Sequence, residues 1–203
     1  MQSLSIITDA TGDPVSVGEV REFCRIDSTR EDRLLKSWTK TAVSYGENFT
    51  KRDFMPKTRK LVLDNFAAII DLPRAPLSTN STDVSIEYVN TTGGTATVDA
   101  TVYVVDSDSE PGKIILAYDS EWPSIRQEKN AVRITYKTGY ALDASSNVTT
   151  PESIKDWIKM RVNGMYQFRE PVVADESLRY LRHDFVDGLL DPYIIISHES
   201  GQI

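Results

Sequence analysis

The sequence predicts an α+β protein: a helical bundle domain formed by N- and C-terminal helices, with an inserted antiparallel β-rich domain of the sandwich or barrel kind. Near both ends of the 203-residue chain, apolar residues recur every three or four positions, as in amphipathic helices. Between these segments, short alternating runs rich in Thr, Val, Ile and Tyr are separated by turn residues, as in β-strands. We therefore expect a discontinuous helical domain over residues 1–54 and 149–203, and a β domain over residues 55–148.

The N-terminal helices are predicted by two S-x-x-E capping boxes, Ser16 with Glu19 and Ser28 with Glu31. The first box precedes a short helix over about residues 17–26, and the second precedes a longer helix. The apolar side chains that recur along one face of the longer helix are Leu34, Leu35, Trp38, Ala42, Tyr45 and Phe49.

Seven strands are predicted in the middle of the chain. The sequence NTTGG at residues 90–94 predicts a hairpin turn, because glycine adopts positive φ without strain. The predicted strands span residues 58–63, 69–72, 84–90, 96–98, 103–106, 113–116 and 131–137.

Helical signals return near the C-terminus. Thr150 and Pro151 begin a third helix, with Thr as the cap and Pro at the first helical position. Asp175 can cap a last helix, which ends before Pro192 because proline interrupts helical hydrogen bonding.

Acidic residues crowd residues 106–123, DSDSEPGKIILAYDSEWP, and suggest a metal or catalytic site at first. Asp106, Asp108 and Glu110 match the start of a calcium loop, but Pro111 replaces the required glycine and Ala117 replaces the bidentate glutamate. A pair of carboxylates for glycoside hydrolysis, using Asp119 and Glu121, is a second alternative. We favour a β-hairpin that turns at residues 111–112, with its acids facing water.

Other catalytic signals are weak. The histidines, His183 and His198, accompany no recognisable nucleophile, and Cys24 lies on the apolar face of the first predicted helix. No glycine-rich phosphate-binding motif occurs. We therefore expect a protein that is not an enzyme, with no catalytic residues, no cofactor and no metal ligands.

The net charge of −7 argues against a protein whose main task is to bind nucleic acid. Basic residues nevertheless gather near the predicted second helix, with Asp and Glu residues between them in the sequence. This pattern favours a solvated face of mixed charge over a nucleic-acid patch. The basic residues are Arg25, Arg30, Arg33, Lys36, Lys40, Lys51 and Arg52, with Arg179 and Arg182 on the last helix.

An apolar, β-prone run, Tyr193, Ile194, Ile195 and Ile196, follows Pro192. No later element is predicted with which it could pair. It docks either on the helices of its own chain or on a partner, for instance by strand addition.

The order of these segments along nearly the whole chain resembles that of the head-to-tail connector proteins, also called adaptor or head-completion proteins, of long-tailed phages. The segments that carry the resemblance are PVSV at 14–17, CRID at 24–27, ED at 31–32, LPRAPL at 72–77, EPGKI at 110–114, WP at 122–123, VRITY at 132–136, GY at 139–140, PESIK at 151–155 and LLDPY at 189–193.

The resemblance implies a structural virion protein that forms a dodecameric ring below the portal protein in the neck between capsid and tail, after assembly in the host cytoplasm. Such a ring extends the channel for genomic DNA, without sequence-specific contact, and provides the docking platform for a downstream stopper or tail-completion protein. It involves no membrane. The resemblance also implies that the run Tyr193, Ile194, Ile195 and Ile196 engages the portal.

The alternative from another class is a β-sandwich module that binds a ligand or carbohydrate, with the helices as scaffold. Its binding platform would consist of exposed aromatic rings, for which the candidates are Tyr88, Tyr103, Tyr118 and Trp122.

Overall fold

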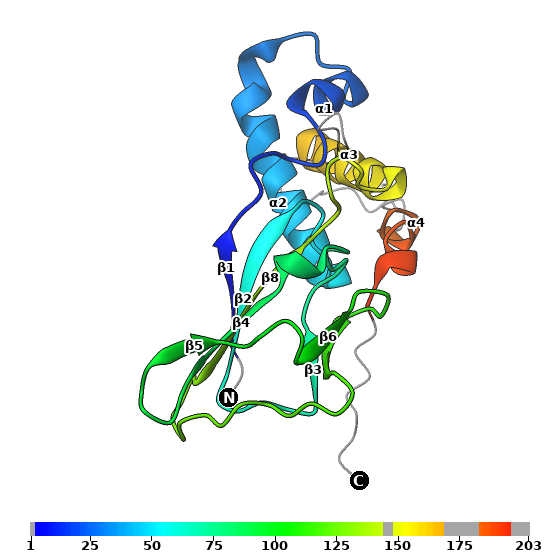
Figure 1. Ribbon diagram of the computed structural model, residues 1–203. Helices are drawn as coiled ribbons and strands as arrows, with labels where there is room; N and C mark the ends of the chain where they lie inside the picture. The colour runs from blue at the N-terminus through cyan, green and yellow to red at the C-terminus, as the bar shows by residue number, and fades with distance from the viewer. Residues whose placement is uncertain (1–2, 144–147, 169–182, 196–203) are drawn as a thin grey trace. The chain divides into compact units, whose positions relative to one another are not determined.

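A computed structural model describes residues 3–143, 148–168 and 183–195, which form two compact units (Figure 1). The first, here called the β unit, contains the described residues up to Ala10, Met55–Ala141 and Ile195. The second, here called the helical unit, contains Thr11–Phe54 and the described residues from Leu142 to Ile194. The combination of helices with two antiparallel sheets confirms the predicted α+β class.

The helical unit is held at its N-terminal end by the capping box that the sequence predicts. Ser16 Oγ accepts from the backbone N–H of Glu19 at 3.2 Å, and the Glu19 carboxylate accepts from the Ser16 N–H at 2.7 Å. The helices are α1 (Val17–Phe23), α2 (Asp32–Thr50), α3 (Glu152–Gln167) and α4 (His183–Gly188), with 3-10 turns at Thr29–Glu31 and Asp191–Tyr193. Residues 175–182 of the predicted last helix lie outside the described residues.

The second predicted capping box does not form. Ser28 Oγ accepts from the N–H of Arg30 and caps only the 3-10 turn before α2. Glu31 does not turn back to close the box, because its carboxylate accepts from the Tyr166 hydroxyl of α3 at 2.9 Å. A contact with a residue 135 positions away therefore overrides the local motif.

Close packing of α2 on α3 centres on Gly46. A Cβ atom at this position would lie 2.7 Å from the Phe54 ring and 3.0 Å from the ring of the fully buried Trp157. The buried face of α2 consists of Leu35, Thr39, Ala42, Gly46, Glu47 and Thr50. The predicted apolar face is thus partly wrong, because Tyr45 and Phe49 are exposed.

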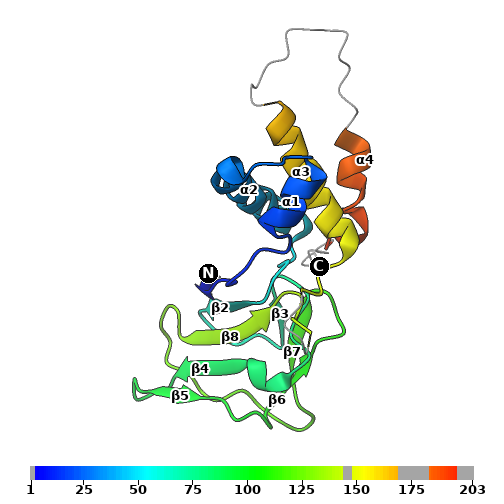
Figure 2. The same cartoon turned by 90° about the horizontal axis from the view of Figure 1, so that it is seen from above.

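The β unit is a sandwich of two antiparallel sheets, ordered β1-β2-β8-β4-β5 and β3-β7-β6 (Figure 2). Side chains such as Leu61, Ile86 and Ile134 from the larger sheet share one core with Leu72 and Ile114 from the smaller sheet. The strands are β1 (Ser3–Thr8), β2 (Lys57–Leu63), β3 (Ile69–Leu72), β4 (Ser85–Val89), β5 (Thr95–Thr97), β6 (Tyr103–Asp106), β7 (Gly112–Leu116) and β8 (Val132–Thr138).

Strand β1 is the element that the sequence analysis missed. It pairs with β2 from Ser3 to Thr8, with an irregularity in register between Ile6 and Thr8. The first ten residues therefore belong to the β unit, although the sequence pattern placed them in the helical domain. The other seven strands lie within one residue of the predicted bounds or are at most one residue shorter at an end.

The turn between β4 and β5 follows the prediction for NTTGG. Gly93 has a φ of 90°, and the Asn90 side chain accepts from the N–H groups of Thr92 and Gly94. Among the described helices, none combines the length and the apolar character that a membrane span requires.

Candidate partner-binding surfaces

The acidic segment at residues 106–123 forms the β6–β7 hairpin and the loop after it. Asp106 accepts from the backbone N–H groups of Asp108 and Ser109 and from the Ser109 hydroxyl. These hydrogen bonds, chiefly the one from the Ser109 side chain, hold the pKa of Asp106 below its usual value. The carboxylate therefore builds the turn. The hairpin is confirmed, but its turn spans residues 107–111, because Gly112, which was predicted to lie in the turn, already belongs to β7.

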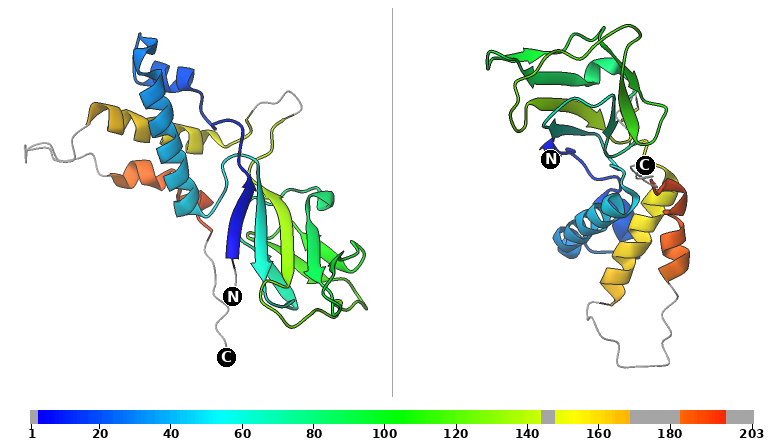
Figure 3. Two further views of the ribbon diagram at one scale, coloured as in Figure 1. Left: turned by 90° about the vertical axis from the view of Figure 1, so that its left-hand side faces the viewer. Right: turned by 90° about the horizontal axis from the view of Figure 1, so that it is seen from below.

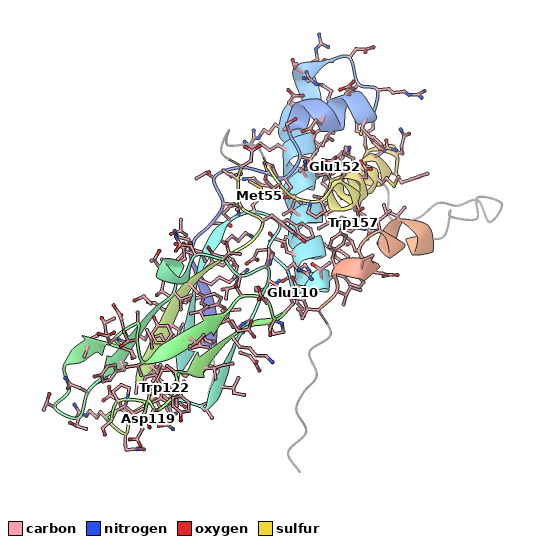
Figure 4. The ribbon with its side chains drawn as sticks, turned by 45° about the vertical axis from the view of Figure 1, so that its right-hand side comes forward. Met55, Glu110, Asp119, Trp122, Glu152 and Trp157 are labelled. Carbon is pink, nitrogen blue, oxygen red and sulfur yellow. The ribbon has the colours of Figure 1, made fainter. Side chains whose placement is uncertain are left out.

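The remaining acids do not converge on a site. Glu110 lies in the turn before β7, whereas Asp119 and Glu121 lie beyond its other end, and all three are exposed. Figure 4 shows Glu110 and Asp119 at opposite ends of the β unit. No cluster of three or more His, Cys, Asp or Glu side chains suited to a metal ion occurs within the described ranges.

The other candidate catalytic groups offer no site. Cys24 is buried, and burial raises the pKa of its thiol, which disfavours the reactive thiolate. His198 lies outside the described residues, and His183 begins α4 without a described side-chain position.

The aromatic side chains proposed for carbohydrate binding do not form a shared platform. Tyr103 is only 8% exposed, and its hydroxyl donates to the Val84 carbonyl inside the β unit. Trp122 stacks on Phe66 with ring centroids 4.5 Å apart, and its Nε1–H donates to the Ala67 carbonyl at 2.9 Å. Among the four candidates, only Tyr118 projects fully into solvent. The Tyr103 and Trp122 side chains are thus used for packing within the β unit, and the four candidates do not form the carbohydrate-binding surface that was predicted as the alternative.

The start of the C-terminal run is fixed to the helical unit. Arg52 follows the end of α2, is nearly fully buried, and donates through Nε to the Tyr193 carbonyl at 2.6 Å. Leu190 is fully buried just before the Asp191–Tyr193 turn. The chain then becomes extended at Ile194, which has φ −71° and ψ 123°.

A buried polar network supports Arg52 from the α2 side. Lys51 takes a left-handed conformation with φ 59°, which turns the chain sharply after the helix. The Glu47 carboxylate, only 6% exposed, then accepts from the Phe54 N–H at 2.9 Å, and Thr150 donates to the Phe54 carbonyl. Buried groups joined in this way hold one geometry, because losing any partner leaves a desolvated polar atom. These buried hydrogen bonds thus fix the backbone at Phe54, two residues after Arg52.

Of the four residues predicted to bind a partner, the structure describes three. Tyr193, Ile194 and Ile195 are each half-buried, so the start of the run is docked on its own chain. Ile196 lies outside the described residues. No sequence pattern predicted the role of Arg52, because its contact joins residues 141 positions apart.

Two further surfaces of the β unit expose apolar side chains. One is β1, which lies at an edge of the larger sheet (Figure 3). This strand carries no charge, and its Ile6 and Ile7 side chains are 46% and 50% exposed. The other is the outer face of the smaller sheet, where Ile115 lies between Ile69 and Val104 in register across three strands. Ile69 and Val104 are each 55% exposed.

Comparison with known proteins identifies the fold. No family model matches the sequence, and no curated protein matches it. Solved structures do match. A chain from the neck of the empty gene transfer agent particle, computed with C6 symmetry, has a TM-score of 0.74 at 18% identity and covers 99% of this chain and 100% of that one.

Two other chains show the same likeness. One, from the neck of the native gene transfer agent particle computed with C12 symmetry, has a TM-score of 0.72 at 19% identity and covers 99% and 100% of the two chains. The other, from the virion of the native particle, has a TM-score of 0.73 at 19% identity and covers 98% of each. The whole chain, helices and strands together, has the fold of these particle chains.

Proposed function

We propose that this protein is a non-enzymatic structural component of the neck of a tailed phage or phage-like particle, where identical copies form a ring. In the more specific form of the proposal, it is the head-to-tail adaptor. The ring docks below the portal, extends the DNA channel and presents a platform for the next neck or tail component.

The observation that carries this proposal is the full-length fold similarity to neck chains of gene transfer agent particles. Coverage of 99–100% of both chains means that neither the helical unit nor the β unit is an addition to the shared architecture. The symmetry of those necks, C6 and C12, supports a ring and is compatible with twelve copies.

Ring closure has a physical requirement that this chain can meet. Each copy in a ring uses two different surfaces, since a head-to-tail contact joins one patch to another patch of its neighbour. The β1 edge and the apolar row Ile69, Ile115 and Val104 are two separate surfaces of this kind. An uncharged edge strand also avoids repulsion between copies that each carry a net charge of −7.

The C-terminal run is the proposed contact to the portal. Arg52 fixes the Tyr193 carbonyl, so the run starts from a defined point, and its next residue, Ile194, is extended. Extended apolar segments bind by adding to a sheet edge or by filling pockets with alternate side chains. Ile194, Ile195 and Ile196 would supply those side chains.

The test is co-assembly with the portal protein of the same particle. A chain truncated after Tyr193 keeps the Arg52 contact, so it should still fold, as a cooperative thermal melt would show, and yet fail to co-sediment with portal rings. Replacing the fully exposed Tyr118 by Ser is the surface control, since no contact is proposed for it, and this change should leave portal binding intact. Undiminished binding by the truncated chain would refute the role of the run, and a full-length chain that never forms rings would refute the neck proposal.

A further inference from the structure

The exposed face of α2 carries a row of positive charge. Arg33, Lys36 and Lys40 are all exposed and are spaced three and four positions apart, so they project from one side of the helix. We call these three residues the basic row. From Arg33 to Lys40 it extends about 10 Å along the helix axis.

The acids that lie close to this row in sequence are directed elsewhere. Asp32 lies beside Arg21, with Oδ1 3.7 Å from Nε, and Glu31 accepts from the Tyr166 hydroxyl. Glu47 is buried against the Phe54 N–H. The mixed charge that the sequence predicted for this face is therefore absent from the row itself.

No acidic side chain in the described part of the chain neutralises the positive charges of the basic row. No ion pair there involves Arg33, Lys36 or Lys40. Like charges at these spacings repel one another and weaken a helix by a few tenths of a kcal/mol per pair. Three such residues on one face are thus not explained by the stability of α2.

The surface beside Lys40 is open. An open hollow there is lined by Ser37, Lys40, Thr41, Ser44, Tyr45 and Asn48, a set that contains no carboxylate. Serine hydroxyls between lysines are typical phosphate partners, since they donate hydrogen bonds and carry no charge of their own.

We infer that the basic row of α2 contacts the phosphate backbone of duplex DNA. This inference deepens the proposed function, since a neck ring must surround DNA, and it assigns α2 to the DNA side of the ring. One strand of a duplex presents a phosphate about every 3.4 Å along the axis, so the length of the row matches about three phosphates.

A duplex fits this face better than single-stranded nucleic acid. Stacking on unpaired bases requires a free aromatic face. The nearby Tyr45 side chain is 49% exposed, but its ring already stacks against Phe49 and Trp157, with centroids 6.2 Å and 6.1 Å away, and the Arg161 guanidinium lies 5.3 Å from its centre. This face of α2 therefore offers positive charges and hydroxyl groups to the phosphate backbone of DNA, and such contacts do not distinguish one base sequence from another.

The strength of such contacts suits a channel. Three phosphate contacts per copy give a slope of about −2.7 for the logarithm of the binding constant against the logarithm of salt concentration. Each copy would bind weakly at physiological salt, so the DNA could still slide.

The experiment measures binding of a labelled mixed-sequence duplex by fluorescence anisotropy, between about 50 and 200 mM salt. The chain with Lys36→Ala and Lys40→Ala should lose most of its binding, with the slope falling to about −0.9. The matched control, Lys60→Ala with Lys129→Ala in the β unit, removes the same charge and should bind like the unaltered chain. Thermal melting confirms that both variants are folded.

Three results would overturn the inference: no salt-dependent binding by the unaltered chain, equal loss in both double variants, or equal binding of polyglutamate, which would identify an acidic protein as the partner. The mass of the assembly, measured in the same samples, separates the two proposals. DNA binding through the row without rings would contradict the neck ring alone, and rings without DNA binding would contradict the basic row alone.

Discussion

Substituting Gly46 by Ala tests how closely α2 and α3 pack. The added Cβ would lie 2.7 Å from Phe54 Cε2 and 3.0 Å from both Phe54 Cζ and Trp157 Cζ3. These atoms belong to two rigid rings, and Trp157 is fully buried, so neither can move aside cheaply. Overpacking of this kind costs about 1–3 kcal/mol, whereas replacing a helical glycine by alanine gains about 1 kcal/mol.

We therefore expect Gly46→Ala to lower the free energy of unfolding by up to about 2 kcal/mol, or the melting temperature by up to about 8 °C. Gly18→Ala is the matched control, since a Cβ there meets only Ser16 Oγ at 3.8 Å. In α1 the same substitution should stabilise by about 0.5–1 kcal/mol. Calorimetry of both variants measures whether each substitution lowers or raises the free energy of unfolding. A Gly46→Ala protein as stable as Gly18→Ala would refute the close approach of the helices.

Three further substitutions address the anchor, a surface charge pair and the sheet edge. Arg52→Met removes the hydrogen bond to the Tyr193 carbonyl, so we expect a loss of about 1.5–3 kcal/mol and faster amide exchange at residues 190–195 by mass spectrometry; unchanged exchange there would contradict the anchor. Hydrogen bonds, from Lys137 first and Ser78 second, lower the pKa of Asp83 below 3.8, so the ionised Asp83 stabilises the fold above that pH and this stabilisation is lost as the pH falls through the lowered pKa. In Asp83→Asn, the free energy of unfolding should therefore fall less steeply as the solution is acidified. An unchanged pH dependence would contradict this. Ile7→Lys on β1 should prevent ring formation, measured by native mass spectrometry, with a stability change within about 0.5 kcal/mol.

Elements governed by local chemistry could be predicted from the sequence. The Ser16 capping box and the NTTGG turn need only neighbours within a few residues, and both form as predicted. Seven strands follow from alternation, because one face of each sheet is buried against the other. The six residues of β1 alternate poorly, exposing Ile6 and Ile7 alike, and so gave no strand signal.

Features set by distant contacts could not be predicted. The Ser28 box fails because Glu31 bonds to Tyr166, and the anchor at Arg52 depends on a carbonyl near the other end of the chain. The basic row has the same origin. In the sequence, Glu31 and Asp32 precede the row and Glu47 follows it, so the segment looks mixed in charge. Only the fold shows that the Glu47 carboxylate turns inward to the Phe54 N–H. For Glu31, Arg52 and Glu47, the residue type is plain from the sequence, but the direction in which each side chain points is set by distant parts of the fold.

The neck ring, the central claim, is tested most directly by electron cryomicroscopy of this protein bound to its portal. We expect a closed ring of identical copies below the portal, with the chain beyond Tyr193 against the portal and α2 towards the DNA channel. Density for this chain anywhere else in the particle, or a portal complex without a closed ring, would contradict it.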